Sequence, residues 1–218
     1  MNSSKRRSPK VTRGSGQGRS QRLSAALRKL GHRVIFTPQE VTRAGIDRRV
    51  IYQLHSAGRL ERIGRGIYVR AGGDLGRHTT LIEATKRVPH GVICLLSALA
   101  FHGLTTQVPR AVWMAIPSKA WRPRSDSPRL NLVHFSGKAL TEGVEEHQIG
   151  GATLRVYNPA KTVADCFKYR NKIGLDVAVE ALRDYWRQRR GTVDDLLLYA
   201  GICRVANVMK PYVEALVE

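Results

Sequence analysis

The side chains best suited to chemistry in this sequence are polar groups spaced for one face of a short helix, residues 47–57. Its apolar residues recur three and four apart, so they would line one side of that helix. The opposite side is left to Arg48, Arg49, Tyr52 and Ser56, with Gln53 further round. Arginine can bind both acceptors of a guanine edge, and the start of a helix in the major groove is where such contacts are made. This pattern predicts contact with DNA bases.

A second row of arginines follows directly in the sequence. It consists of Arg59, Arg62, Arg65 and Arg70. Arg65 stands between Gly64 and Gly66, which suit a tight turn that would project its side chain toward a phosphate or a minor groove. Arginines on an exposed face are usually only solvated. Their clustering on two adjoining segments favours binding to a polyanion instead.

Catalytic chemistry has little support in the sequence. No Asp or Glu is followed two positions later by another acid or by Lys, so the metal-binding pairs of nucleotidyltransferases and of one large nuclease class are missing. The glycine patterns of phosphate-binding loops are missing too. Cys94, Cys166 and Cys203 lack the spacing of a zinc site, and burial is favoured over a nucleophilic role for Cys166 paired with a distant His. We expect no catalytic residue, no metal and no cofactor.

The net charge indicates which class of molecule the protein binds. The 218 residues contain 37 Lys and Arg against 17 Asp and Glu, a net charge of +20. Residues 1–77 hold 18 basic and 4 acidic residues, whereas residues 78–218 hold 19 and 13. A polyanion, above all double-stranded DNA, is therefore expected to bind the N-terminal part. The longest apolar stretch, Val92–Phe101, is too short to span a bilayer, which predicts a cytoplasmic, nucleoid-associated protein without a membrane partner.

The elements that must position these arginines can be read from caps and periodicity. Residues 1–21 are Ser, Gly, Arg and Lys with almost no apolar content, which predicts a disordered basic arm. Helices are expected over 22–30, from Thr37 to about Ala44 with a capping box, and from Asp47 to Ala57. A hairpin of 60–63 and 67–69 with its turn at 64–66 should follow. Residues 22–77 are thus predicted to be a winged helix-turn-helix domain.

Beyond residue 77 the pattern becomes mixed, with a hairpin across Gly150-Gly151. Expected strands are 111–116 and 130–135, a hairpin spans 148–158, and expected helices are 78–88, 95–102, 159–170, 175–190, 192–201 and 205–217. Asn158 and Thr192 are predicted N-caps. The fold class predicted for the chain is α+β: an N-terminal winged helix-turn-helix, then a mixed α/β domain, residues 78–218, with C-terminal helices.

Three segments together resemble the AbiEi family of antitoxins from type IV toxin-antitoxin systems. They are residues 58–68 (GRLERIGRGIY), 97–105 (SALAFHGLT) and 157–166 (YNPAKTVADC). The resemblance covers about 33–190. It implies a bacterial autorepressor that binds inverted repeats in its own promoter, as a homodimer or as cooperative monomers. It also implies that 78–218 counteracts a nucleotidyltransferase-like toxin without requiring a stable complex, and it supplies no catalytic residue.

Three other functions remain open on the sequence alone. One is a nucleic-acid-processing enzyme that uses a winged helix for targeting, which the missing metal motifs disfavour. Another is a solitary winged-helix regulator without a toxin. The third is a general nucleoid or RNA-coating protein, which is disfavoured because RNA readers stack bases on aromatic rings and only 6% of these residues are aromatic.

Overall fold

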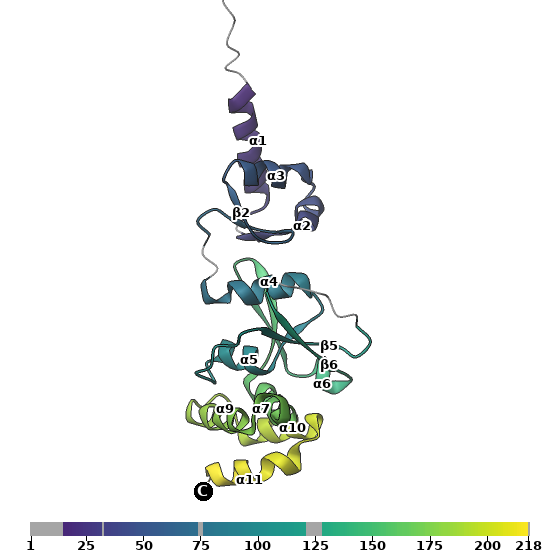
Figure 1. Ribbon diagram of the computed structural model, residues 1–218, viewed down its shortest axis with the longest axis vertical. Coiled ribbons are helices and arrows are strands. Elements are labelled where there is room, and N and C mark those ends of the chain that lie inside the picture. Colours follow the sequence, from purple (N-terminus) through teal and green to yellow (C-terminus); the bar gives the residue numbers. More distant parts are fainter. Residues whose placement is uncertain (1–14, 32, 74–75, 121–127, 218) are drawn as a thin grey trace, which may run out of the picture. The chain divides into compact units, whose positions relative to one another are not determined.

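The computed structural model describes residues 15–31, 33–73, 76–120 and 128–217 (Figure 1). Contacts within the chain divide it into two compact units, with the division between Gly73 and Asp74. The first unit combines three helices with three short strands, and the second combines a five-stranded sheet with a group of C-terminal helices. The mixed α+β class with C-terminal helices is confirmed.

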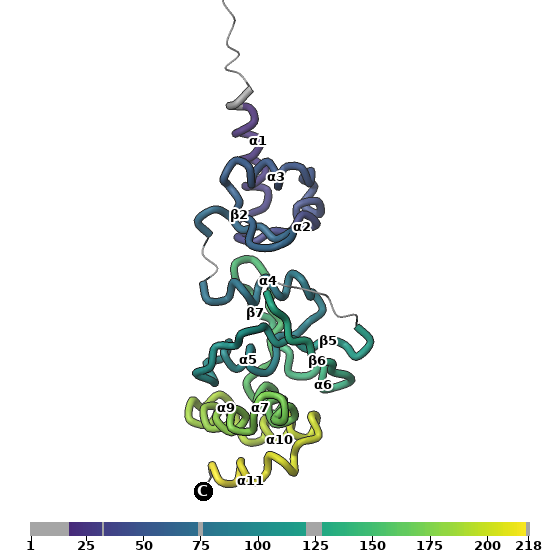
Figure 2. Tube along the Cα trace, viewed as in Figure 1, coloured from purple at the N-terminus to yellow at the C-terminus, as the bar shows by residue number. Residues whose placement is uncertain are grey.

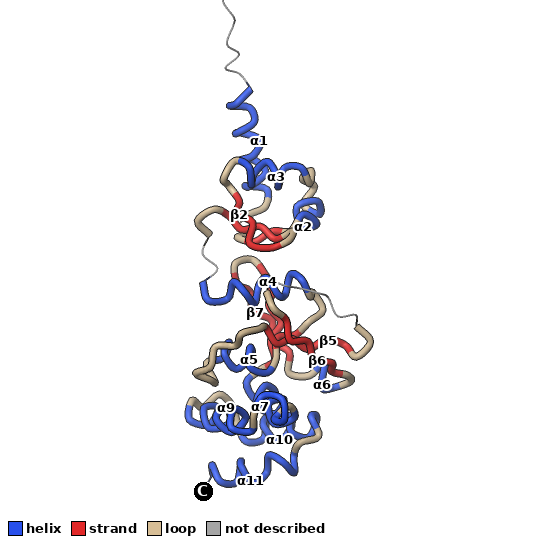
Figure 3. The backbone as a smooth tube through the Cα atoms, in the orientation of Figure 1, coloured by secondary structure: helices blue, strands red, loops and turns tan. Residues whose placement is uncertain are grey.

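The first unit packs its helices on one side of a small antiparallel sheet of strand order β1-β3-β2 (Figure 3). Its elements are α1 (Ser15–Lys29), β1 (Ile35–Phe36), α2 (Pro38–Arg43), α3 (Arg49–Ser56), β2 (Leu60–Gly64) and β3 (Ile67–Arg70). Its core is formed by nine buried side chains: Leu23, Leu30, Phe36, Val41, Ile46, Ile51, Leu54, Leu60 and Tyr68. The core therefore takes one apolar stripe from each helix and one face of the sheet.

Helix α1 begins earlier than predicted. It starts at Ser15 rather than Arg22, so residues 15–21 of the expected disordered arm are helical, which corrects that expectation. These residues carry no apolar side chain, but extending a helix from an anchored turn adds one hydrogen bond for each residue fixed. Leu23 and Leu30 provide the anchor because both are buried. The rest of the expected arm, residues 1–14, lies outside the described residues.

Side-chain caps define the next two helices. The Thr37 hydroxyl accepts from the backbone of Glu40, whose carboxylate accepts from the backbone of Thr37, so the predicted capping box at α2 is confirmed. Before α3, Asp47 Oδ1 accepts from the backbone N–H of Arg49 at 2.7 Å. Asp47 thus satisfies a free N–H as predicted, although the regular helix starts two residues later.

The β2–β3 hairpin has a tighter turn than predicted. Gly64 pairs with Ile67, so the turn consists of Arg65 and Gly66 alone. Gly66 has φ +71°, a conformation that favours glycine. The third strand, β1, was not predicted because two residues show no alternation. It pairs Phe36 with Tyr68.

The second unit is built on a mixed sheet of strand order β6-β5-β4-β8-β7. Its strands are β4 (Val92–Ile93), β5 (Val112–Pro117), β6 (Leu130–Phe135), β7 (Val144–Ile149) and β8 (Ala152–Tyr157). Strands β5 and β6 run parallel, and β7 and β8 form the antiparallel hairpin predicted at Gly150-Gly151. The short β4 joins these two pairs, antiparallel to β5 and parallel to β8.

The second unit also contains helices, some packed on this sheet and others in the C-terminal group. They are α4 (Thr79–Arg87) after a 3₁₀ turn η1 (Gly76–His78), α5 (Leu95–His102), α6 (Lys138–Thr141), α7 (Pro159–Lys168), α8 (Arg170–Ile173), α9 (Leu175–Arg187), α10 (Val193–Cys203) and α11 (Ala206–Val217). Figure 2 shows α5 beside α7, although they are far apart in the sequence, and the two helices pack directly. Residues 160–167 of α7 are all buried, so this helix forms the centre of the core.

The predicted helix termini in the second unit largely hold. Asn158 caps α7, with its Oδ1 accepting from the backbone N–H of Lys161 at 2.8 Å, and Thr192 caps α10 in a capping box with Asp195. Gly103 ends α5 at φ +69°. Among the described residues no helix is both long enough and apolar enough to cross a membrane.

Candidate nucleic-acid interface

The residues predicted to touch DNA bases are all exposed on the outer side of α3. Arg49, Tyr52, Gln53 and Ser56 are neighbours three or four apart on this helix, so their side chains form one surface. Arg48 is also exposed, in the turn that precedes the helix. The buried positions Ile51 and Leu54 hold the opposite side of α3 in the core. We call the five exposed residues the α3 face.

Arg62 lies on the side of the hairpin that carries α3. It is the cross-strand partner of Tyr68, so the two side chains project from the same face of the sheet. The Tyr68 ring is in edge-to-face contact with Tyr52, with ring centroids 6.4 Å apart. Arg62 Nε donates to the carbonyl oxygen of Gly64 at 3.2 Å, which restrains the guanidinium without burying it. The hairpin thus brings a cation next to the α3 face.

The other two hairpin arginines are placed at its two ends. Arg59 follows α3, is exposed, and its backbone N–H closes the helix on the carbonyl oxygen of Leu54. Arg65 is exposed at the turn. Residues 15–73 contain twelve Lys or Arg against three Asp or Glu, a balance of +9. Two of those acids, Glu40 and Asp47, are engaged at helix starts. A basic surface of this kind can bind the phosphates of a polyanion.

Arg70 has a different role from the one predicted for the cationic row. Its guanidinium donates to the carbonyl oxygens of Leu27, at 2.9 Å, and Gly31, at the end of α1, and to that of Arg33 at 3.0 Å. It also lies over the Phe36 ring, 5.8 Å from the centroid. The carbonyls at a helix C-terminus lack partners within the helix, and a cation satisfies them well. Arg70 is therefore a structural residue. Sequence alone missed this, because its partners are about 40 residues away.

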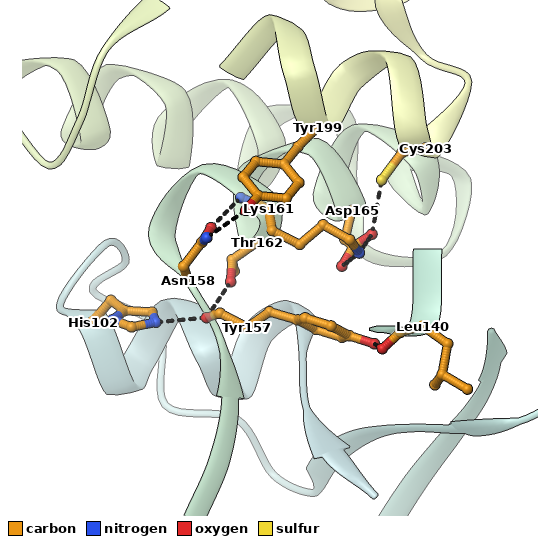
Figure 4. Close-up of polar contacts among 9 residues, drawn as sticks. All are labelled: His102, Leu140, Tyr157, Asn158, Lys161, Thr162, Asp165, Tyr199 and Cys203. Carbon is orange, nitrogen blue, oxygen red and sulfur yellow. Dashed lines mark hydrogen bonds and ion pairs between the residues drawn. The ribbon is translucent and has the colours of Figure 1, made fainter. Parts of the chain in front are cut away.

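A second polar cluster lies inside the second unit (Figure 4). Lys161 and Asp165, one turn apart on α7, are fully buried, and Lys161 Nζ is 2.6 Å from each Asp165 carboxylate oxygen. Lys161 Nζ also lies 4.1 Å from the centroid of the Tyr157 ring and 4.9 Å from that of Phe135. The thiol of Cys203 donates to Asp165 Oδ1 at 3.2 Å. The Lys–Asp spacing of four on a largely apolar helix was the sequence signal that could have revealed this pair.

The pKa shifts in this cluster favour a structural role over a nucleophilic one. Burial raises the pKa of the Asp165 carboxyl to about 6, against the opposing attraction of Lys161. Burial, with the Asp165 carboxylate adding to it, raises the pKa of the Cys166 thiol well above its ordinary value. A nucleophilic cysteine needs the opposite shift and access to solvent. In the described part of the chain, no three His, Cys, Asp or Glu side chains come together as metal ligands.

The last two segments of the expected family resemblance meet beside this cluster. His102, at the end of α5, has its Nε2 2.7 Å from the carbonyl oxygen of Tyr157, and Thr162 donates to the same oxygen at 3.0 Å (Figure 4). Tyr157 in turn donates from its hydroxyl to the carbonyl oxygen of Leu140 at 2.8 Å. Segments 97–105 and 157–166 are thus joined through one backbone carbonyl, which gives them a shared structural role.

The α3 face and the hairpin fall within the part of the chain that matches a known family. Residues 25–71 match the family described as transcriptional regulator, AbiEi antitoxin. The AbiEi resemblance predicted from the sequence is confirmed over these residues. Segments 97–105 and 157–166 lie outside the matched range. No curated protein matches the chain significantly.

Among solved structures, the crystal structure of the RV2827C protein from Mycobacterium tuberculosis has a similar fold. It superposes with a TM-score of 0.55 at 16% sequence identity, covering 84% of this chain and 70% of that chain. The likeness therefore extends well beyond the AbiEi-matched residues. At this identity it concerns the fold alone.

Proposed function

We propose that the chain is a DNA-binding transcriptional autorepressor and antitoxin of a type IV toxin-antitoxin system. The observation that carries the proposal is the α3 face, whose polar side chains are exposed beside the cationic hairpin. In this proposal the first unit is a winged helix-turn-helix. Helix α2 is the first helix, α3 the recognition helix, and the β2–β3 hairpin the wing.

The residue roles follow from position. Arg48 and Arg49, at the start of α3, read base edges in the major groove, with Tyr52, Gln53 and Ser56 along the same surface. Arg59 and Arg62 bind phosphates, which set the register on the duplex. Arg65, at the tip of the wing, enters a minor groove or touches a phosphate.

The second unit, in this proposal, counteracts a nucleotidyltransferase-like toxin without forming a stable complex with it. Support comes from the antitoxin description of the matched family. Residues 78–218 hold only +6 of the +20 net charge, so DNA binding does not account for this unit. The proposal assigns no catalytic step to this unit, and the buried Lys161–Asp165 pair is closed to a substrate.

Footprinting on the DNA upstream of its own gene tests the repressor. Protection of an inverted repeat is expected, with an affinity at least about 10³-fold above that for random DNA at physiological salt. The double variant Arg48→Ala with Arg49→Ala should lose the footprint. The matched variant Arg110→Ala with Arg129→Ala removes two exposed arginines of the second unit and should keep it. Uniform protection of all sequences would refute sequence-specific repression.

Co-expression with the toxin tests the antitoxin. The toxin gene, expected next to this one, is placed under a foreign promoter so that repression cannot silence it. The Arg48→Ala, Arg49→Ala variant should then restore growth as well as the wild-type chain does. If rescue requires the intact α3 face, antitoxicity is no more than repression of the toxin gene. If neither form rescues growth, the chain is a regulator alone.

A further inference from the structure

Four charged residues of helix α9 stand in a segregated order, beside Asp184, which is paired with Arg187. Asp176 and Glu180 lie in the first half of α9, and Arg183 and Arg187 lie in its second half. At about 100° per residue, the four positions fall within about 60° of one another around the helix axis. They therefore form one line along the helix, which we call the α9 stripe.

Interactions within the helix account for this order only in part. Residues four apart in the stripe carry the same charge, which slightly destabilises a helix, and only Glu180 and Arg183, three apart, carry opposite charges. The helix dipole favours an acid in the first turn and a base in the last turn. It therefore explains the placement of Asp176 and Arg187 only. Arg187 also contacts Asp184 at 2.8 Å, and Glu180 accepts from the hydroxyl of Thr106 at 3.4 Å, but within the described residues neither Asp176 nor Arg183 has an ion-pair partner. The stripe is thus a set of charges suited to an outside partner.

An apolar flank runs along one side of the stripe. Val179 and Trp186 of α9 and Leu216 of α11 line a surface depression together with the stripe residues. Trp186 is 39% exposed, which is high for so large an apolar side chain. Exposed aromatic groups with a charged border are typical of protein–protein contacts.

We infer that a second copy of the chain docks on the α9 stripe, with the two α9 helices antiparallel about a two-fold axis. Asp176 lies as far before the midpoint of Ala181 and Leu182 as Arg187 lies after it, and Glu180 and Arg183 are equally symmetric about this point. An antiparallel pair centred there sets each acid level with an arginine of the partner. The four charges then form four ion pairs, which is the self-complementarity that a two-fold contact requires.

The apolar flank fits the same arrangement. A two-fold axis perpendicular to both helices keeps the flank on the same side in each copy, so Trp186 of one copy lies beside the first half of α9 of the other. One helix pair with such a flank is smaller than the standard interface of about 800 Å² per partner. The docking is therefore weak and reversible. It is independent of DNA binding and is measured without DNA.

Sedimentation of the full chain over a concentration series tests the inference through two opposite charge variants. Arg183→Glu with Arg187→Glu makes the stripe wholly acidic, and Asp176→Arg with Glu180→Arg makes it wholly basic. Wild type should show an average mass that rises toward that of a dimer. Each variant alone should stay monomeric, and an equimolar mixture of the two should form a heterodimer. The variant Lys119→Glu with Lys168→Glu has the same net charge as the acidic variant and should behave as wild type.

Circular dichroism and thermal melting check that each variant is folded. If a double variant is not folded, Arg183→Glu and Glu180→Arg are used singly, because their mixture restores both central pairs. A monomeric wild type at every concentration would overturn the inference. So would variants that still self-associate, or a mixture that remains monomeric.

Discussion

Arg70 Nη2 lies 2.9 Å from the carbonyl oxygen of Leu27, a residue 43 positions earlier in the chain. The contact fastens the C-terminal end of α1 to strand β3, and it removes Arg70 from the set of cations available to DNA. Arg65, on the same hairpin, is exposed at the turn instead. Replacing Arg70 should therefore affect the stability of the fold, whereas replacing Arg65 should affect DNA binding.

Arg70→Ala should lower the free energy of unfolding by about 1.5–3 kcal/mol, the usual contribution of hydrogen bonds to a charged group. Arg70→Lys should recover only part of this, because an ammonium lacks the planar fork that reaches several carbonyls. Arg65→Ala should leave stability unchanged and lower the slope of log affinity against log salt by about 1. Thermal melting and DNA titrations over a salt series measure both. A reduced salt slope with unchanged stability in Arg70→Ala would place Arg70 on the DNA instead.

Arg49→Ala should weaken specific DNA binding by about 1–3 kcal/mol and relax the preference at one operator position. Arg62→Ala should weaken binding to all sequences alike, because a phosphate carries no sequence information. Affinity measured against a library of single-base operator variants separates the two results. An Arg49→Ala variant with an unchanged preference profile would mean that base reading lies elsewhere on the α3 face.

Deletion of residues 1–14 should weaken DNA binding and leave the melting temperature unchanged. This segment has five Lys or Arg and no acid, so it can contact phosphates, while its apolar content is too low to add to a core. The cut is made at Ser15 because α1 starts there. Equal affinities of the deleted and full-length forms at every salt concentration would exclude a role for the segment in binding.

Lys161→Met should lower the free energy of unfolding by about 3–5 kcal/mol, because it leaves the Asp165 carboxylate buried without its partner. The double variant Lys161→Met with Asp165→Leu should recover much of the loss, since apolar groups of similar size can replace a buried ion pair. Lys210→Met is the control. Its exposed pair with Glu214, 3.7 Å apart, should contribute about 1 kcal/mol at most. Denaturant unfolding gives all three values, and equal losses from Lys161→Met and Lys210→Met would disprove the role assigned to the buried pair.

Acid should destabilise the second unit through His102. Burial lowers the pKa of His102 below its ordinary value of 6.5, so the unfolded chain binds a proton more readily than the folded one. The stability tied to neutral His102 is present above pH 6.5 and is lost as the pH falls through the lower, folded pKa. His102→Gln keeps an N–H for the carbonyl oxygen of Tyr157 and should reduce this pH dependence. Part should persist, because burial lowers the pKa of His78 as well, whereas the raised pKa of Asp165 acts in the opposite direction over the same pH range. If the His102→Gln variant had the same change of unfolding free energy between pH 5 and pH 7 as the wild type, His102 would not be a source of the pH dependence.

The sequence predicted the elements whose ends are set by local chemistry. The capping box at Thr37, the N-cap at Thr192 and the turn at Gly150-Gly151 are fixed by residues within a few positions, so they were found at the right places. Strand β4 could not be found, because two apolar residues are strand only where β5 and β8 flank them. The early start of α1 likewise follows from packing further along the helix and not from residues 15–21.

The residues of the candidate site were likewise predicted from the sequence only in part. Periodicity around residues 47–57 identified the exposed side of α3, because burial of Ile51 and Leu54 determines which side remains outside. Periodicity could not separate Arg70 from Arg65, since that difference depends on a carbonyl oxygen brought in from α1. The partners of a side chain across the fold are decided by tertiary structure, and a cationic row in sequence need not be a cationic row in space.

The two-residue strand β4 also has a consequence for how the second unit folds. It is the only link in the described sheet between the β5–β6 pair and the β7–β8 hairpin, and its parallel side rests on the single pairing of Ile93 with Val156. The β7–β8 hairpin can form locally, but the pairing of Ile93 with Val156 must close a loop of about 60 residues. Because closing this loop costs entropy, the pairing forms late in folding. The sheet should therefore open first at β4, between the β5–β6 pair and the β7–β8 hairpin, which are each held together by six cross-strand pairs. Hydrogen exchange of the backbone amides measures this opening.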